Sequence, residues 1–145
     1  MSSLAAAIRP YEDRDRDALV ALWTACDLTR PWNPPDRDIA LLRGSGHGEI
    51  FVAEREEGAG ALLGSVMVGH DGHRGWLYYL AVAPAARRRG LGRRLAARAE
   101  EWLTSRGVPK AMLLVRETNT AVTAFYERLG YAVEPRVLMT RWLNG

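Results

Sequence analysis

The stretch Val82-Ala83-Pro84-Ala85-Ala86-Arg87-Arg88-Arg89-Gly90-Leu91-Gly92 decides the fold that we expect for this chain. It follows an aromatic and apolar run at 76–82, which predicts a buried strand that Pro84 brings to an end. It opens a segment at 90–106 whose apolar residues recur at helical spacing: Leu91, Leu95, Ala99, Trp102 and Leu103. A strand, a turn rich in arginine and glycine, and a long helix therefore follow one another.

The turn itself predicts an anion site. The first backbone N–H groups of a helix have no partner within it, and they carry the positive end of the helix dipole. Gly90 and Gly92 let the backbone approach an anion without a Cβ in the way. The turn is neither a P-loop, because no Gly-Lys-Ser/Thr follows, nor a dinucleotide fingerprint, because the third glycine is missing. A helix start with a solvated basic face is the alternative.

The flanking segments predict a mixed α/β sheet in one domain, 1–145, with a disordered lead-in at residues 1–5. The predicted order is β-α-α-β-β-β-α-β-α-β-β. We expect 76–82 to be the central strand, and a turn at 57–60 to join the second and third strands. The other strands are expected at 7–11, 50–55, 62–69, 111–115, 131–133 and 137–142, and the helices at 13–26, 36–43, 90–106 and 119–129.

The composition fits a soluble, cytoplasmic protein. Of the 145 residues, 48% are hydrophobic and 26% charged, and no run approaches the roughly 20 apolar residues of a membrane span. The single cysteine, Cys26, excludes an internal disulfide, and we expect its thiol to be buried. The histidines and the cysteine lack the spacing of metal ligands, so no metal is expected. Six arginines within twelve residues favour an anionic ligand: Arg87, Arg88, Arg89, Arg93, Arg94 and Arg98.

Two motifs resemble those of the GNAT superfamily of N-acetyltransferases. Val-x-Pro at 82–84 followed by Arg-x-x-Gly-x-Gly at 87–92 resembles its motif A. Asn119, then Tyr126 with Glu-Arg-Leu-Gly-Tyr at 127–131, resembles its motif B. The two stand in the family's order with a strand between them. Three further stretches, at 30–33, 69–75 and 78–80, resemble the bacterial YpeA-type acetyltransferases.

This resemblance implies an acetyl-CoA-dependent enzyme in which an amine attacks the thioester directly. Tyr126 would act as the general acid that protonates the leaving thiolate, or else would merely pack. Asn119 and Tyr126 would also contact acetyl-CoA. The backbone of Leu80, Ala81 and Val82 would pair with the pantetheine arm. The pyrophosphate would lie on the turn: Arg87, Arg88, Arg89, Gly90, Leu91, Gly92 and Arg93.

The acceptor side is less defined by the resemblance. We expect five residues near the acceptor: Trp32, Asn33, Asp71, Tyr78 and Tyr79. Trp32 would be either a rigid wall for the substrate or a plug over the core. The strand 76–82 has no acid, so the base would be Asp71, with His70, His73 and Glu117 as alternatives, or a neutral amine would need none.

Three other functions stay open at this stage. A ribosomal-protein-type N-terminal acetyltransferase would act on a peptide rather than a small amine. A non-catalytic acyl-CoA sensor would bind without turnover, which the presence of Asn119 and Tyr126 opposes. A nucleic-acid binder would use the arginine cluster and would lose affinity steeply with salt. We expect neither nucleic acid nor membrane as a partner, and a homodimer is left open.

Overall fold

The computed structural model describes residues 5–55 and 60–144, and its contacts divide the chain into two compact units, 1–113 and 114–145. The expected turn at 57–60 and the lead-in at 1–5 lie outside the described residues, apart from Gly60 and Ala5. We describe each unit by itself. Among the described residues, no helix has the length and apolar character needed to cross a membrane.

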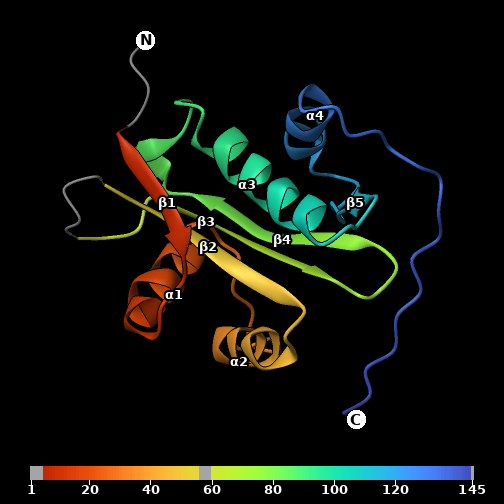
Figure 1. Ribbon diagram of the computed structural model, residues 1–145, viewed down its shortest axis with the longest axis horizontal. Coiled ribbons are helices and arrows are strands. Elements are labelled where there is room, and N and C mark those ends of the chain that lie inside the picture. The colour runs from red at the N-terminus through yellow and green to blue at the C-terminus, as the bar shows by residue number, and fades with distance from the viewer. Residues whose placement is uncertain (1–4, 56–59, 145) are drawn as a thin grey trace. The chain divides into compact units, whose positions relative to one another are not determined.

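The first unit is built on a five-stranded sheet in the order β1-β2-β3-β4-β5 (Figure 1). Neighbouring strands are antiparallel, except that β5 runs parallel to β4. In this order β3 lies at the centre of the sheet, whereas the segment expected there, 76–82, forms the next strand, β4. The strands are β1 (Ala6–Pro10), β2 (Gly48–Arg55), β3 (Gly64–His70), β4 (Gly75–Val82) and β5 (Ala111–Met112).

Helices cover both faces of this sheet. The helix α3 (Leu91–Ser105) lies on one face, and α1 (Arg16–Ala25) and α2 (Pro35–Ser45) lie on the other (Figure 1). The apolar stripe predicted for α3 is confirmed, since all five of its residues are buried. The expected helix at 13–26 begins instead with a 3₁₀ turn at Asp13–Asp15, and a second 3₁₀ turn, Pro84–Ala86, follows β4.

An arginine joins three elements at the start of the chain. Arg9 on β1 donates to both carboxylate oxygens of Asp15 at 2.7 and 2.8 Å, and to Glu54 of β2 at 3.0 and 3.1 Å. The hydrogen bonds from Arg9 hold the pKa of Asp15 and that of Glu54 below their usual values. The first strand is thereby fixed to the turn that precedes α1 and to its neighbour in the sheet.

The second unit contains one helix, α4 (Thr120–Arg128). From Leu129 to Asn144 the described chain forms neither helix nor strand, so the strands predicted at 131–133 and 137–142 are wrong. Alternating apolar residues favour a pleated backbone, but a strand also needs hydrogen bonds to a neighbouring strand. This segment makes no such ladder, and Val137 and Met139 are each 87% exposed. Likewise β5 ends at Met112 rather than at Val115.

Candidate functional site

After β4 the chain turns into α3, and no capping or acidic side chain of α3 offsets the positive end of the helix dipole at its first turn. The N-cap residue Gly90 has a left-handed backbone, with φ of 80°, which glycine adopts without strain. No side chain caps α3, and its first turn contains no acidic residue. The N–H groups of Leu91, Gly92 and Arg93 therefore lack an intrahelical acceptor, and no side chain within 5–55 and 60–144 accepts from them. An anion is the ligand that such a helix start favours.

The arginine cluster divides into residues that serve the fold and residues that do not. Arg87 donates through Nε to the carbonyl oxygen of Val82 at 3.0 Å, and Arg94 donates to the carbonyl oxygen of Ala6 at 2.8 Å. Arg98 lies over the ring of a core phenylalanine, 4.9 Å from its centroid. The remaining three are exposed and have no hydrogen-bond or ion-pair partner in the described part of the chain: Arg88, Arg89 and Arg93. Three of the six guanidinium groups are therefore free to contact a ligand directly, while the other three add their charge from positions fixed by the fold.

The strand that leads into this turn has an irregular edge. Met67 of β3 pairs with Tyr78 and Ser65 pairs with Ala81, so two residues of β4, Tyr79 and Leu80, lie opposite a single residue of β3. This is a β-bulge, and at Tyr79 the backbone φ is 51°, a left-handed value that non-glycine residues rarely adopt. On its other edge β4 pairs with β5 only at Gly75 and Trp76. The stretch 77–82 therefore has no strand partner on that edge among the described residues.

Four side chains hold Tyr79 in its strained conformation. Its ring stacks on Trp23 at a centroid distance of 3.9 Å, and its carbonyl oxygen accepts a hydrogen bond from Ser65 Oγ at 2.9 Å. Its hydroxyl donates to Asp38 Oδ2 at 2.5 Å and accepts from Asn33 Nδ2 at 3.2 Å. Burial, together with the Asp38 carboxylate, raises the pKa of Tyr79 above its usual value. Of these partners the sequence pointed only to Asn33.

Asp71, the predicted base, uses both carboxylate oxygens in hydrogen bonds that stabilise its own turn. Its Oδ1 accepts from the backbone N–H groups of Arg74 at 2.7 Å and His73 at 2.9 Å, and its Oδ2 accepts from the indole of Trp76 at 3.1 Å. Hydrogen bonds from Arg74, Trp76 and His73 lower the pKa of Asp71 to about 2. A carboxylate so stabilised in its charged form is a weak base. The alternative His70 likewise accepts the N–H of Gly72 within the same turn.

The aromatic residues expected near an acceptor differ in their exposure. Trp32 is 61% exposed in the turn before α2, so it does not plug the core. Tyr78 is 46% exposed and lies parallel to Trp76, with ring centroids 6.4 Å apart. Cys26, expected to be buried, is partly buried at the end of α1 and donates weakly to the carbonyl oxygen of Val82 at 3.4 Å.

The motif B residues belong to the second unit. Asn119 is the N-cap of α4, and its Oδ1 accepts the backbone N–H of Val122 at 3.3 Å. Tyr126 is only 8% exposed, and its ring meets those of Phe125 and Tyr131 edge-on at 5.1 and 5.4 Å. Burial raises the pKa of Tyr126 to about 12. No hydrogen bond holds its hydroxyl among the described residues, so both roles expected for Tyr126, general acid or packing residue, stay open.

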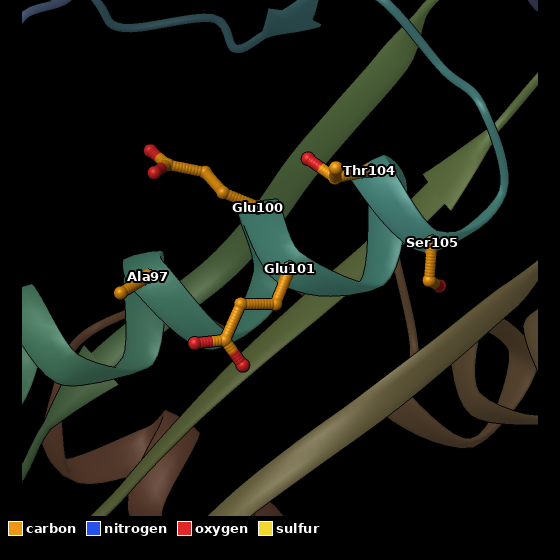
Figure 2. Close-up of a pocket in the computed structure, with 5 residues that line it drawn as sticks. All are labelled: Ala97, Glu100, Glu101, Thr104 and Ser105. Carbon is orange, nitrogen blue, oxygen red and sulfur yellow. The ribbon is translucent and has the colours of Figure 1, made fainter.

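A shallow hollow on α3 lies apart from all of the predicted site residues. Figure 2 shows its lining, which comes from the second half of the helix: Ala97, Glu100, Glu101, Thr104 and Ser105. Two carboxylates suit a phosphate ligand poorly, because like charges repel. The hollow is therefore a poor candidate for an anion site, in contrast to the first turn of the same helix.

Comparison with known proteins gives a consistent result. Residues 16–131 match the model of the Acetyltransferase (GNAT) family. An acetyltransferase of Yersinia enterocolitica is 43% identical over 94% of both chains, and one of Pectobacterium atrosepticum is 46% identical over 86% of both. Among solved structures, an aminoglycoside N-acetyltransferase in complex with CoA has a TM-score of 0.78 at 20% identity, over 95% of both chains. A Trypanosoma brucei acetyltransferase has a TM-score of 0.74 at 23% identity, over 94% of this chain and 99% of the other. The resemblance noted in the sequence is thus confirmed: the chain belongs to the GNAT family of acetyltransferases.

Proposed function

We propose that this acetyltransferase uses acetyl-CoA and transfers its acetyl group directly to a primary amine of a small molecule or a protein. The observation that carries the proposal is the uncapped N-terminus of α3, which follows, after a short turn, a strand whose residues 77–82 have no strand partner on one edge within the described part of the chain. One structural relative, an aminoglycoside N-acetyltransferase, is described both in complex with CoA and in complex with the bisubstrate analogue CoA-S-monomethyl-acetylneamine. Those descriptions support the same pair of substrate types for this chain.

In this proposal the main chain does most of the binding of acetyl-CoA. The N–H groups of Leu91, Gly92 and Arg93 hold the pyrophosphate, and Arg88 and Arg89 add charge from the turn. Arg87 supports the turn through its bond to Val82. The pantetheine arm lies along Leu80, Ala81 and Val82 as an added strand. The bulge at Tyr79 and Leu80 interrupts the ladder, which leaves a backbone N–H for the oxyanion of the thioester.

The chemical step needs no covalent intermediate on the protein. The amine nitrogen attacks the thioester carbon in its neutral form, the carbon–sulfur bond breaks, and the surplus proton of nitrogen passes to solvent. Tyr126 supplies the proton that the thiolate takes up, and Asn119 binds the pantetheine; both assignments rest on the match to motif B. The Tyr126 hydroxyl is protonated at neutral pH, and because its pKa of about 12 makes it a weak acid, its proton passes only as the carbon–sulfur bond breaks and is then replaced from solvent. Asp71 has no part in this scheme, because its pKa of about 2 makes it a weak base.

The test combines binding with turnover. Release of coenzyme A thiol from acetyl-CoA is followed over a panel of amines and peptides, and the dissociation constant of coenzyme A is measured by calorimetry. Gly90→Val places a β-branched residue at a φ of 80° and should weaken coenzyme A binding more than Arg88→Ala. Arg106→Ala, at the far end of α3, is the control. Equal binding by all variants would show that the anion lies elsewhere.

A second pair of measurements separates an enzyme from a binding module. Tyr126→Phe should lower kcat by about 10²-fold or more, the usual contribution of a general acid, with the coenzyme A dissociation constant unchanged. An unchanged kcat would remove Tyr126 as the acid. If the protein binds coenzyme A tightly but releases no thiol with any acceptor, it is better described as a sensor. If it binds nucleic acid and coenzyme A does not compete, it is better described as a nucleic-acid binder.

A further inference from the structure

Asp38 is a partly buried carboxylate on α2 that the reaction scheme does not use. Only one of its two oxygens is occupied: Oδ2 accepts from the Tyr79 hydroxyl at 2.5 Å and from Asn33 Nδ2 at 3.0 Å. No donor reaches Oδ1 from any residue that the structure describes. The two hydrogen bonds to Oδ2 fix the whole carboxylate, so Oδ1 is an ordered acceptor rather than part of a mobile surface group.

The charge of Asp38 is uncompensated. Both of its partners are neutral donors, and no cationic side chain lies within ion-pair distance in the described segments. Several other acids of the first unit are paired with arginine: Asp15 and Glu54 share Arg9, and Asp36 binds Arg16 at 2.6 and 2.8 Å. A partly buried charge without a counter-ion is unfavourable, which makes a cation the ligand that this position favours.

The position of Asp38 connects it to the strand on which the acetyl group is proposed to lie. Its Oδ2 touches Tyr79, which is the bulge residue next to Leu80. Asn33, its other partner, follows the exposed Trp32, and Tyr78 adds a second exposed ring on the same strand. Aromatic rings and a carboxylate together are a usual environment for an ammonium group.

We propose that Asp38 Oδ1, with Asn33 beside it, binds an ammonium group of the acceptor, and that the acceptor therefore carries at least two amino groups. The bound group is not the one that reacts, because a carboxylate stabilises the charged form of an amine and so opposes formation of the neutral nucleophile. Asp38 is thus a substrate-binding residue that selects polycationic amines over amines with a single amino group. This inference rests on the proposed function, which supplies the acetyl-CoA at β4.

The test measures binding first, without turnover. The side-chain amide of Asn33 serves as the local reporter in nuclear magnetic resonance spectra of ¹⁵N-labelled full-length protein titrated with 1,4-diaminobutane. Its neutral isostere, 1,4-butanediol, is titrated in parallel. We expect a saturable shift with the diamine and an affinity for the diol that is about tenfold or more weaker, as for hydrogen bonds that lose a charge. Equal affinity for both compounds, or no saturable shift, would overturn the proposal without the need for any variant.

Two matched variants complete the experiment. Asp38→Asn keeps an oxygen that accepts the Tyr79 bond but removes the charge, and it should weaken diamine binding about tenfold or more. Asp36→Asn, two residues earlier on the same helix and in an exposed ion pair with Arg16, should leave it unchanged. Equal loss in both variants, or none in Asp38→Asn, contradicts the assignment. Binding that depends on Asp38 but is accompanied by no thiol release from acetyl-CoA would refute the proposed function and leave the ammonium site standing.

Discussion

Replacement of Ser65 by alanine should destabilise the first unit far more than the loss of one small hydroxyl suggests. Ser65 is completely buried, accepts the indole N–H of Trp23 at 3.0 Å and donates to the carbonyl oxygen of Tyr79 at 2.9 Å. The alanine variant leaves a buried donor and a partly buried acceptor without partners. Each such group costs about 1–3 kcal/mol, and the partly buried carbonyl group of Tyr79 lies at the low end, so we expect a loss of about 2–4 kcal/mol in the free energy of unfolding.

The assay is urea denaturation followed by far-ultraviolet circular dichroism, which does not depend on tryptophan emission. Ser45→Ala is the control, because that hydroxyl and both of its partners, the carbonyl oxygen of Leu42 and the backbone N–H of His47, are exposed, so that water can replace each bond. It should change the free energy of unfolding by no more than about 0.5 kcal/mol.

A double-mutant cycle then tests the cause of the loss. Trp23→Phe removes the indole N–H, so in its background Ser65→Ala no longer strands that donor. The combined variant should be more stable than the sum of the two single losses predicts, by about 1 kcal/mol. A cost below about 0.5 kcal/mol for Ser65→Ala, or strict additivity in the cycle, would refute the view that this hydroxyl holds the bulge.

Two further predictions concern the sheet and its first strand. A Cβ at Gly75 would lie 2.6 Å from a leucine side chain of α3, so Gly75→Ala should lower the free energy of unfolding by about 1–3 kcal/mol. Gly44 lies inside α2, and a Cβ there would have no atom within 4 Å, so Gly44→Ala should raise the free energy of unfolding by about 0.5–1 kcal/mol. Thermal unfolding of both variants measures the difference, and equal effects would contradict this prediction. In the folded protein the pKa values of Asp15 and Glu54 are lowered from their ordinary values of 3.8 and 4.5. These two carboxylates therefore stabilise the fold at a pH above the ordinary values, and this stabilisation is lost as the pH falls through their lowered pKa values. Arg9→Gln should therefore flatten the fall in Tm between about pH 5 and pH 3, and an unchanged slope would show that Arg9 is not the cause.

Much of the first unit could be predicted from the sequence because local signals and packing agree there. The stripe of α3 has the helical period, Pro84 ends β4, and Gly90 supplies the left-handed residue before the helix. The tail after α4 could not be predicted in this way. The alternation of apolar and polar residues at 137–142 favours an extended backbone with one apolar face. Whether another strand pairs with this segment depends on the rest of the chain.

The candidate site was predictable where it depends on the backbone and unpredictable where it depends on distant side chains. Motif A placed the turn, since glycine spacing determines its conformation. The partition of the arginine cluster, by contrast, depends on which carbonyl groups lie nearby: Arg94 reaches Ala6, which is 88 positions away in the chain. Asp38 carries no sequence signal at all, because an aspartate in the first turns of a helix is usually favourable for the helix dipole alone. The surroundings of Asp71 could not be predicted for a related reason: its turn supplies donors that stabilise its charged form and lower its pKa.

The bond between Asp38 and Tyr79 also has a mechanical consequence. It joins α2 to the one residue of β4 whose backbone lies in an unfavourable region, so these two elements cannot shift independently without breaking it. Trp23 and Ser65 oppose any relaxation of that residue from the other side. A displacement of α2 of even a fraction of an ångström would therefore be passed to the peptide groups of Leu80 and Ala81. The shape of the β4 edge, on which the acetyl group is proposed to lie, is then a property of the helical layer as much as of the sheet, and substitutions in α2 that touch no substrate should alter turnover.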